Sequence, residues 1–99
     1  EKGQKSKSDV LDSVSSALPS LMRAQKLIKK AGIEVSEQKS TENIVELTKK
    51  IKAANLCDKE TLIAELLFEC GKLGNIYKLD LEQALYNKND SFCVENRKN

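Results

Sequence analysis

The chain of 99 residues contains no histidine and no tryptophan. Without histidine, catalysis by Ser-His-Asp or Cys-His groups, zinc sites that use histidine and the usual proton shuttle near neutral pH are excluded. Without tryptophan, the largest aromatic platform for stacking on a nucleobase is missing. Any chemistry must therefore rest on carboxylates, lysines, cysteines or backbone groups.

Glycine, proline and aromatic residues are scarce, with four glycines, one proline, two tyrosines and two phenylalanines. All-β proteins need more turn-forming and aromatic residues, so the composition favours a helical protein. A chain of this length makes one domain with one core. Lys and Arg number 17 and Asp and Glu number 15, and the formal charge of +2 is too small to indicate binding to nucleic acid.

Long apolar runs and paired cysteines are also missing. No apolar run approaches the ~18 residues that cross a bilayer, so we expect no membrane segment. Cys57, Cys70 and Cys93 are an odd number, and their spacing fits neither a metal knuckle nor a closed disulfide framework. This favours a reducing compartment, and we expect a cytoplasmic protein. Because the chain does not begin with Met, we also expect it to be part of a longer protein.

The apolar residues recur at intervals of three and four along most of the chain, which predicts helices. We expect a flexible linker over residues 1–9, a short turn or helix over 10–17, and the first main helix from Pro19 to Ala31, interrupted in its apolar pattern only at Gln25. Gly32 is expected to end this helix.

Three more helices are predicted from caps and apolar stripes. The second is expected to begin at Ser40 or Thr41, and the third to run from Asp58 to about Gly74, with enough apolar residues to make it the most buried helix. Asp80 is expected to cap the fourth, which frays after residue 94. Four helices with short links predict an all-α antiparallel four-helix bundle over residues 10–99.

Carboxylates beside the apolar stripes are the candidates for a metal site, because they would line a cleft between helices. At 100° per residue, Glu46 flanks the stripe of the second helix, and Glu65 and Glu69 lie one turn apart on one flank of the third. Mg²⁺ takes oxygen ligands, so these three carboxylates could bind it if the two helices face each other. The pattern alone favours the alternative, three solvated glutamates on helix surfaces.

The first main helix carries a basic run of Arg23, Lys26, Lys29 and Lys30. These side chains could face a phosphate, although a charge run of this kind is usually a solvated face. The cysteines are interpreted as small core residues, because the chain offers no evident base to activate a thiol. No residue is therefore assigned a catalytic role.

Several segments resemble one family. Residues 8–26 read SDVLDSVSSALPSLMRAQK and resemble the segment that opens the catalytic domain of MazG nucleoside triphosphate pyrophosphohydrolases, roughly SVLDGVPKSLPALMRAQK. Residues 65–68 (ELLF), 80–85 (DLEQAL) and 89–92 (NDSF) resemble the family's landmarks DLLF, DPEEAL and NRKF, in the same order. The resemblance covers almost the whole chain.

The resemblance implies an all-α bundle that commonly dimerises, and Mg²⁺-dependent cleavage of a nucleoside triphosphate to a monophosphate and pyrophosphate. We expect a homodimer in which Lys26 and Lys30, together with Asn89 of the last landmark, contact the nucleotide. Residues 1–3 resemble the end of the linker before the last MazG domain of longer proteins. The upstream part would then be a second MazG domain or a tetrapyrrole methylase domain.

The metal-ligand pattern of the family, E-x-x-E on one helix and E-x-x-D on the next, falls here on Asn43, Glu46, Leu62 and Glu65. Two of the four carboxylates are replaced. We therefore expect a divergent domain with weak or lost hydrolase activity that serves as a dimerisation or nucleotide-sensing module. The alternatives are an active Mg²⁺-dependent hydrolase that uses a rearranged site of Glu46, Glu65 and Glu69, and a purely structural helical interaction module.

Overall fold

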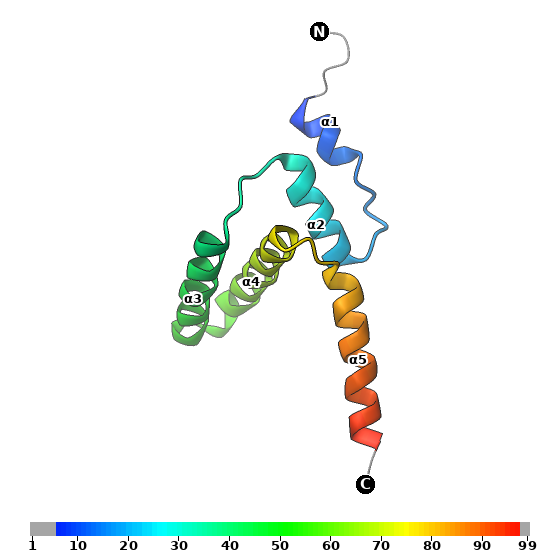
Figure 1. Ribbon diagram of the computed structural model, residues 1–99. Coiled ribbons are helices and arrows are strands. Elements are labelled where there is room, and N and C mark those ends of the chain that lie inside the picture. The colour runs from blue at the N-terminus through cyan, green and yellow to red at the C-terminus, as the bar shows by residue number, and fades with distance from the viewer. Residues whose placement is uncertain (1–5, 98–99) are drawn as a thin grey trace.

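The computed structural model describes residues 6–97, and throughout this range the regular elements are helices (Figure 1). They are α1 Lys7–Asp12, α2 Ser20–Ala31, α3 Glu37–Ala53, α4 Leu56–Ile76 and α5 Leu81–Arg97. The predicted all-α class is confirmed. Residues 1–5 of the predicted linker lie outside the described residues, while residues 7–9 belong to α1 rather than to a linker. No helix in residues 6–97 is long and apolar enough to span a membrane.

The ends of α2 follow the local rules used in the prediction. Pro19 is its N-cap residue, and Gly32 ends it with a φ of 69°. Only glycine adopts this left-handed conformation without steric cost, so a helix commonly stops where such a residue follows it. Asp80 likewise caps α5 as predicted, since its Oδ1 accepts a hydrogen bond from the Gln83 amide at 3.1 Å.

The remaining ends differ from the prediction. α3 begins one turn earlier than Ser40 or Thr41, because the Ser36 side chain accepts the Lys39 amide at 3.1 Å and caps the helix there. α4 begins after Asn55 rather than at Asp58. It also continues past Gly74, because the close packing of Leu81 and Gln25 on this residue outweighs the low helix propensity of glycine. α5 does not fray after residue 94 but continues to Arg97.

The body of the molecule is an antiparallel pair, α3 and α4, with α2 lying across the C-terminal half of α4 (Figure 1). At one end of the pair, Lys59 Nζ donates a hydrogen bond to the Ile51 carbonyl oxygen at 2.5 Å. Gly71 allows α2 to approach α4, since a Cβ there would lie 3.4 Å from Cδ1 of Ile28, which is 2% exposed. The core is small: besides Ile28, the buried apolar side chains of residues 6–97 are Val14 and Leu47.

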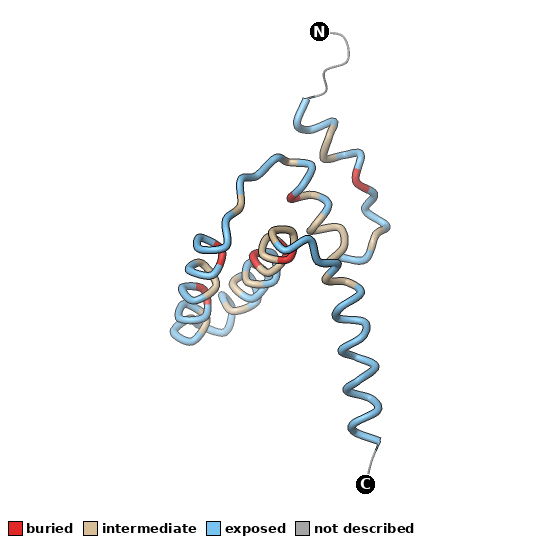
Figure 2. The backbone as a smooth tube through the Cα atoms, viewed as in Figure 1, coloured by how far each residue is buried: buried red, intermediate tan, exposed pale blue. Residues whose placement is uncertain are grey.

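α5 leaves this body and runs away from it, with almost all of its length exposed (Figure 2). The chain therefore measures 63 × 33 × 27 Å and has a radius of gyration of 16.5 Å, compared with about 13 Å for a compact domain of this length. α4 holds more buried residues than any other helix of residues 6–97, as predicted, but they are Glu69, Gly71 and Gly74, while its large apolar side chains Ile63, Leu67 and Phe68 are exposed. One side of the helical assembly is thus open.

Candidate functional site

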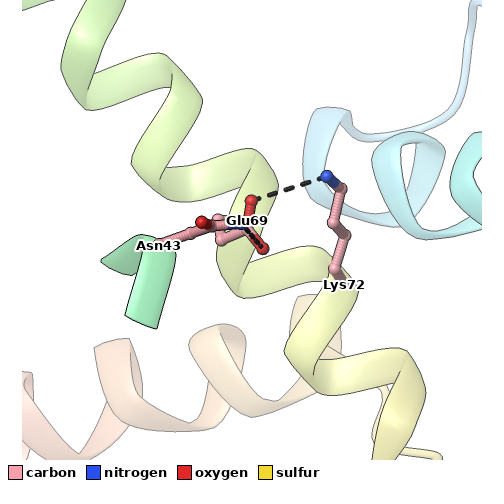
Figure 3. A network of polar contacts seen from close by, with 3 residues as sticks. All are labelled: Asn43, Glu69 and Lys72. Atoms are coloured by element: carbon pink, nitrogen blue, oxygen red, sulfur yellow. Dashed lines mark hydrogen bonds and ion pairs between the residues drawn. The ribbon is translucent and has the colours of Figure 1, made fainter. Parts of the chain in front are cut away.

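A cluster of three polar side chains lies between α3 and α4 (Figure 3). Asn43 of α3 donates a hydrogen bond from Nδ2 to Oε2 of Glu69 on α4 at 3.3 Å. Lys72, one turn further along α4, places Nζ 3.5 Å from the other oxygen, Oε1. Glu69 is 7% exposed, so this carboxylate has been taken out of water and is held by one amide and one ammonium group.

The environment of Glu69 explains the identity of its partners. A buried carboxylate is costly unless it is paired and hydrogen-bonded. Lys72 supplies the charge and also lies 5.9 Å from the centre of the Phe68 ring, a favourable position for a cation. A polar pocket of about 370 Å³ opens beside this cluster. It is lined by Glu34, Val35, Ser36, Lys39, Ser40, Asn43, Glu69 and Lys72.

Cys70 follows Glu69 on α4 and is partly buried. Burial, and then the negative charge of Glu69, raise the pKa of the Cys70 thiol. A raised pKa keeps the thiol protonated and lowers its nucleophilicity, because the thiolate is the reactive form. This agrees with the interpretation of Cys70 as a packing residue, whereas the same interpretation is wrong for Cys57 and Cys93, which are exposed.

The predicted metal ligands are only partly brought together. Glu65 and Glu69 line one groove of about 380 Å³ on α4, whose lining does not include Glu46. The contacts Asn43–Glu69 and Ile51–Lys59 fix the register of the antiparallel helices α3 and α4. In this register Glu46 and Glu65 lie at the same height along the helix pair. Both side chains are exposed. Within residues 6–97, no three His, Cys, Asp or Glu side chains are grouped so that they could hold a metal ion. In this part of the chain, Glu46, Glu65 and Glu69 are thus not gathered around one point.

The amide side chain of Asn43 is explained by its neighbour, the Glu69 carboxylate. Two carboxylates at the Asn43 and Glu69 positions would repel each other unless a cation lay between them. An amide at position 43 instead donates directly to Glu69. The hydrogen-bonding groups of Asn43 and Glu69 thus pair without an added cation. The sequence indicated this contact, since Asn43 lies close to the apolar stripe of its helix and Glu69 lies on the flank of the facing helix.

The predicted nucleotide-binding residues lie on two helices that diverge. Lys26 and Lys30 are exposed on α2, and Asn89 is exposed on α5. The two helices meet at their first turns, where Glu82 Oε1 accepts the Met22 amide at 3.3 Å, and from there run in different directions (Figure 1). Their assignment to a nucleotide stays a prediction, and in this conformation a ligand would contact the lysines and Asn89 at separate places.

Gln25 of α2 forms hydrogen bonds to the end of α4 and to the start of α5, a role that the sequence did not reveal. Its Nε2 donates to the Asn75 Oδ1 atom and to the Leu79 carbonyl oxygen, both at 2.9 Å. Its Oε1 accepts the Leu81 amide at 3.0 Å, and Asn75 returns a bond to the Gln25 carbonyl oxygen at 3.0 Å. One amide side chain thus connects three segments at the point where α5 begins.

Comparison of the chain with models of known protein families, with curated proteins and with solved structures gives no match.

Proposed function

We propose that this chain is a divergent MazG-type helical domain that acts as a self-association module and has weak or no activity on nucleoside triphosphates. The observation that carries the proposal is the open apolar side of the molecule. The chain exposes 7820 Å², whereas a compact monomer of its mass, 11.0 kDa, exposes about 5600 Å². The excess of about 2200 Å² counts polar as well as apolar surface, and it is larger than the ~800 Å² that each partner contributes to a typical stable interface.

The four-helix bundle expected for this family belongs to the same proposal. α4 packs against both α3 and α2, whereas α5 does not run along them, so a bundle built on these helices would lack one side. A second chain would supply the missing side. Self-association therefore accounts both for the open surface and for an isolated helix, which on its own is only marginally stable in water.

Weak or absent hydrolysis is supported by the polar cluster. A Mg²⁺ site needs carboxylate oxygens that are free to bind the ion and the phosphates. Here Glu69 is buried and occupied by Asn43 and Lys72, and Leu62 stands at another ligand position of the pattern. The ammonium group of Lys72 also opposes the approach of a divalent cation to Glu69.

A second candidate function is an active Mg²⁺-dependent pyrophosphohydrolase with a rearranged site. The observations that favour it are the groove shared by Glu65 and Glu69 and the position of Glu46 level with Glu65. To share one ion, Glu46 would have to turn towards this groove and Glu69 would have to leave Asn43 and Lys72. Lys26, Lys30 and Asn89 would then be tested as contacts to the triphosphate.

Two measurements distinguish these functions. Light scattering over a range of protein concentrations should show a dimer, and a monomer at all concentrations would contradict the proposed self-association. Release of pyrophosphate from a panel of nucleoside triphosphates with Mg²⁺ or Mn²⁺ should be absent or very slow. Rapid release that is abolished by Glu46→Ala and by Glu65→Ala would establish the second candidate instead.

A further inference from the structure

One face of α4 is apolar along its length except at Glu60, but it is covered along only half of that length. At 100° per residue, Leu56, Ile63, Leu67, Gly71 and Gly74 lie within roughly 80° of one another. The two glycines contact α2 and Leu81. Towards the start of the helix, Leu56, Ile63 and Leu67 are 84%, 43% and 57% exposed. These three residues, together with Glu60 between Leu56 and Ile63, are called the α4 row below.

The α4 row leads into an apolar groove at the base of α5. The groove has a volume of about 440 Å³. It is lined by Ser20, Leu21, Ala24, Ala64, Leu67, Phe68, Glu82 and Leu85. Because Leu67 belongs to both surfaces, the row and the groove are one continuous apolar surface.

α5 carries an apolar face of its own that the other helices of residues 6–97 contact only near its start. Leu81, Leu85, Lys88 and Phe92 lie within roughly 60° of one another on the helix. Leu81 packs on Gly74 and Leu85 lines the groove, but Phe92 is 58% exposed. Leu85, Lys88 and Phe92 are called the α5 row below.

We propose that the α4 row binds the α5 row of a second copy of this chain, in a two-fold dimer that exchanges the α5 helices. This inference rests on the proposed self-association and names the surface that performs it. Each chain has one exposed row on α4 and one exposed row on α5. In a two-fold dimer, the α5 row of each chain covers the α4 row of the other, so all four rows are buried. No row is then left to bind a third chain. The excess exposed area is sufficient for such an interface.

The spacing and charge of the two rows match when the helices run antiparallel. On the α4 row, Glu60 lies four residues after Leu56 and three before Ile63, and it is exposed. On the α5 row, Lys88 lies three residues after Leu85 and four before Phe92, and it is also exposed. Placing Lys88 of one copy opposite Glu60 of the other therefore sets Leu85 opposite Ile63 and Phe92 opposite Leu56. The only charged residue of each row then faces the opposite charge.

The apolar part of this interface is tested by Phe92→Glu and Ile63→Glu, measured by light scattering with sedimentation equilibrium. Both side chains are exposed in the single chain, so the fold should persist, which far-ultraviolet circular dichroism checks. We expect each variant to weaken dimerisation by about tenfold or more, since a charge would replace a buried contact. The matched control is Val45→Glu, because Val45 is 53% exposed on α3 and lies outside both rows. It should leave the dimer unchanged.

The register is tested by charge reversal. Lys88→Glu should weaken the dimer, and adding Glu60→Lys in the same chain should restore it, because the opposite charges then face each other again. If the wild type is a dimer and Phe92→Glu and Ile63→Glu dimerise equally well, the inferred interface is wrong but the proposed self-association stands. If the wild type is a monomer, the interface and the self-association are both wrong. A dimer weakened by Lys88→Glu and weakened further by Glu60→Lys would overturn the antiparallel pairing.

Discussion

Replacing Gly74 with alanine tests the joint that directs α5. A Cβ at this position would lie 2.6 Å from Cδ1 and 2.7 Å from Cγ of Leu81, and 2.9 Å from Nε2 of Gln25. Carbon atoms in well-packed proteins approach to about 3.5 Å, so neither neighbour can stay where it is. Moving Leu81 shifts the first turn of α5, and moving Gln25 disturbs the hydrogen bonds to residues 79 and 81.

The expected effect of Gly74→Ala is a net loss of stability. Overpacking typically costs about 1–3 kcal/mol, and each disturbed hydrogen bond adds about 1 kcal/mol. Alanine in a helix interior returns about 1 kcal/mol relative to glycine. The balance is a destabilisation of about 2–4 kcal/mol, and for a domain of this size each kcal/mol lowers the Tm by roughly 4–8 °C.

Gly71→Ala is the matched control, because Gly71 is also buried in α4. Its Cβ would lie 3.4 Å from Cδ1 of Ile28, the flexible end of a side chain, so the helix gain should dominate. We expect this variant to be as stable as the wild type or up to about 1 kcal/mol more stable. Thermal and urea unfolding followed by circular dichroism, at one fixed protein concentration, measure both. A Gly74→Ala protein that melts at or above the wild-type Tm would refute the close packing of Leu81.

Three further predictions concern single side chains. Gln25→Ala should lower the free energy of unfolding by about 2–3 kcal/mol in urea titrations, because three side-chain hydrogen bonds are lost, whereas Lys26→Ala should change it by less than about 0.5 kcal/mol. The hydrogen bond from Tyr77 to the Glu37 carboxylate raises the pKa of Tyr77, so its stabilisation is present below the ordinary tyrosine pKa and is lost as the pH rises through the raised one. Glu37→Gln should therefore lower the tyrosinate absorbance midpoint in a protein whose other tyrosine is phenylalanine, and an unchanged midpoint would argue against the bond. Cys70 should react with a thiol reagent at least tenfold more slowly than the two exposed cysteines, and equal rates for all three would contradict its burial.

The parts of the fold that depend on local chemistry could be predicted from the sequence. Pro19 and Gly32 bound α2 because their backbone preferences act over one or two residues. The start of α3 was misplaced although its rule is equally local, because Ser36 and Ser40 both offer a capping oxygen and the polar residues between them carry no apolar pattern to choose between the two.

The parts that depend on distant segments could not be predicted. Gln25 looked like a gap in an apolar pattern, and its partners at residues 79 and 81 lie 54 and 56 positions further along the chain. Similarly, the pattern showed that Leu67 belongs to the apolar face of α4 but did not show whether another helix of the same chain covers it. For the candidate site, the carboxylates were correctly placed on facing helices, while the Asn43–Glu69 contact depended on the register between them.

The short link between α4 and α5 makes the final helix a lever. Lys78 turns the chain with a φ of 59°, and the amide group of Gln25 fixes the direction in which α5 departs. Seventeen residues of helix extend about 25 Å, so a rotation of about 10° at this pivot moves the far end by about 4 Å. Anything joined to the C-terminal end of α5 would have its position set mainly by hydrogen bonds at the opposite end of the helix.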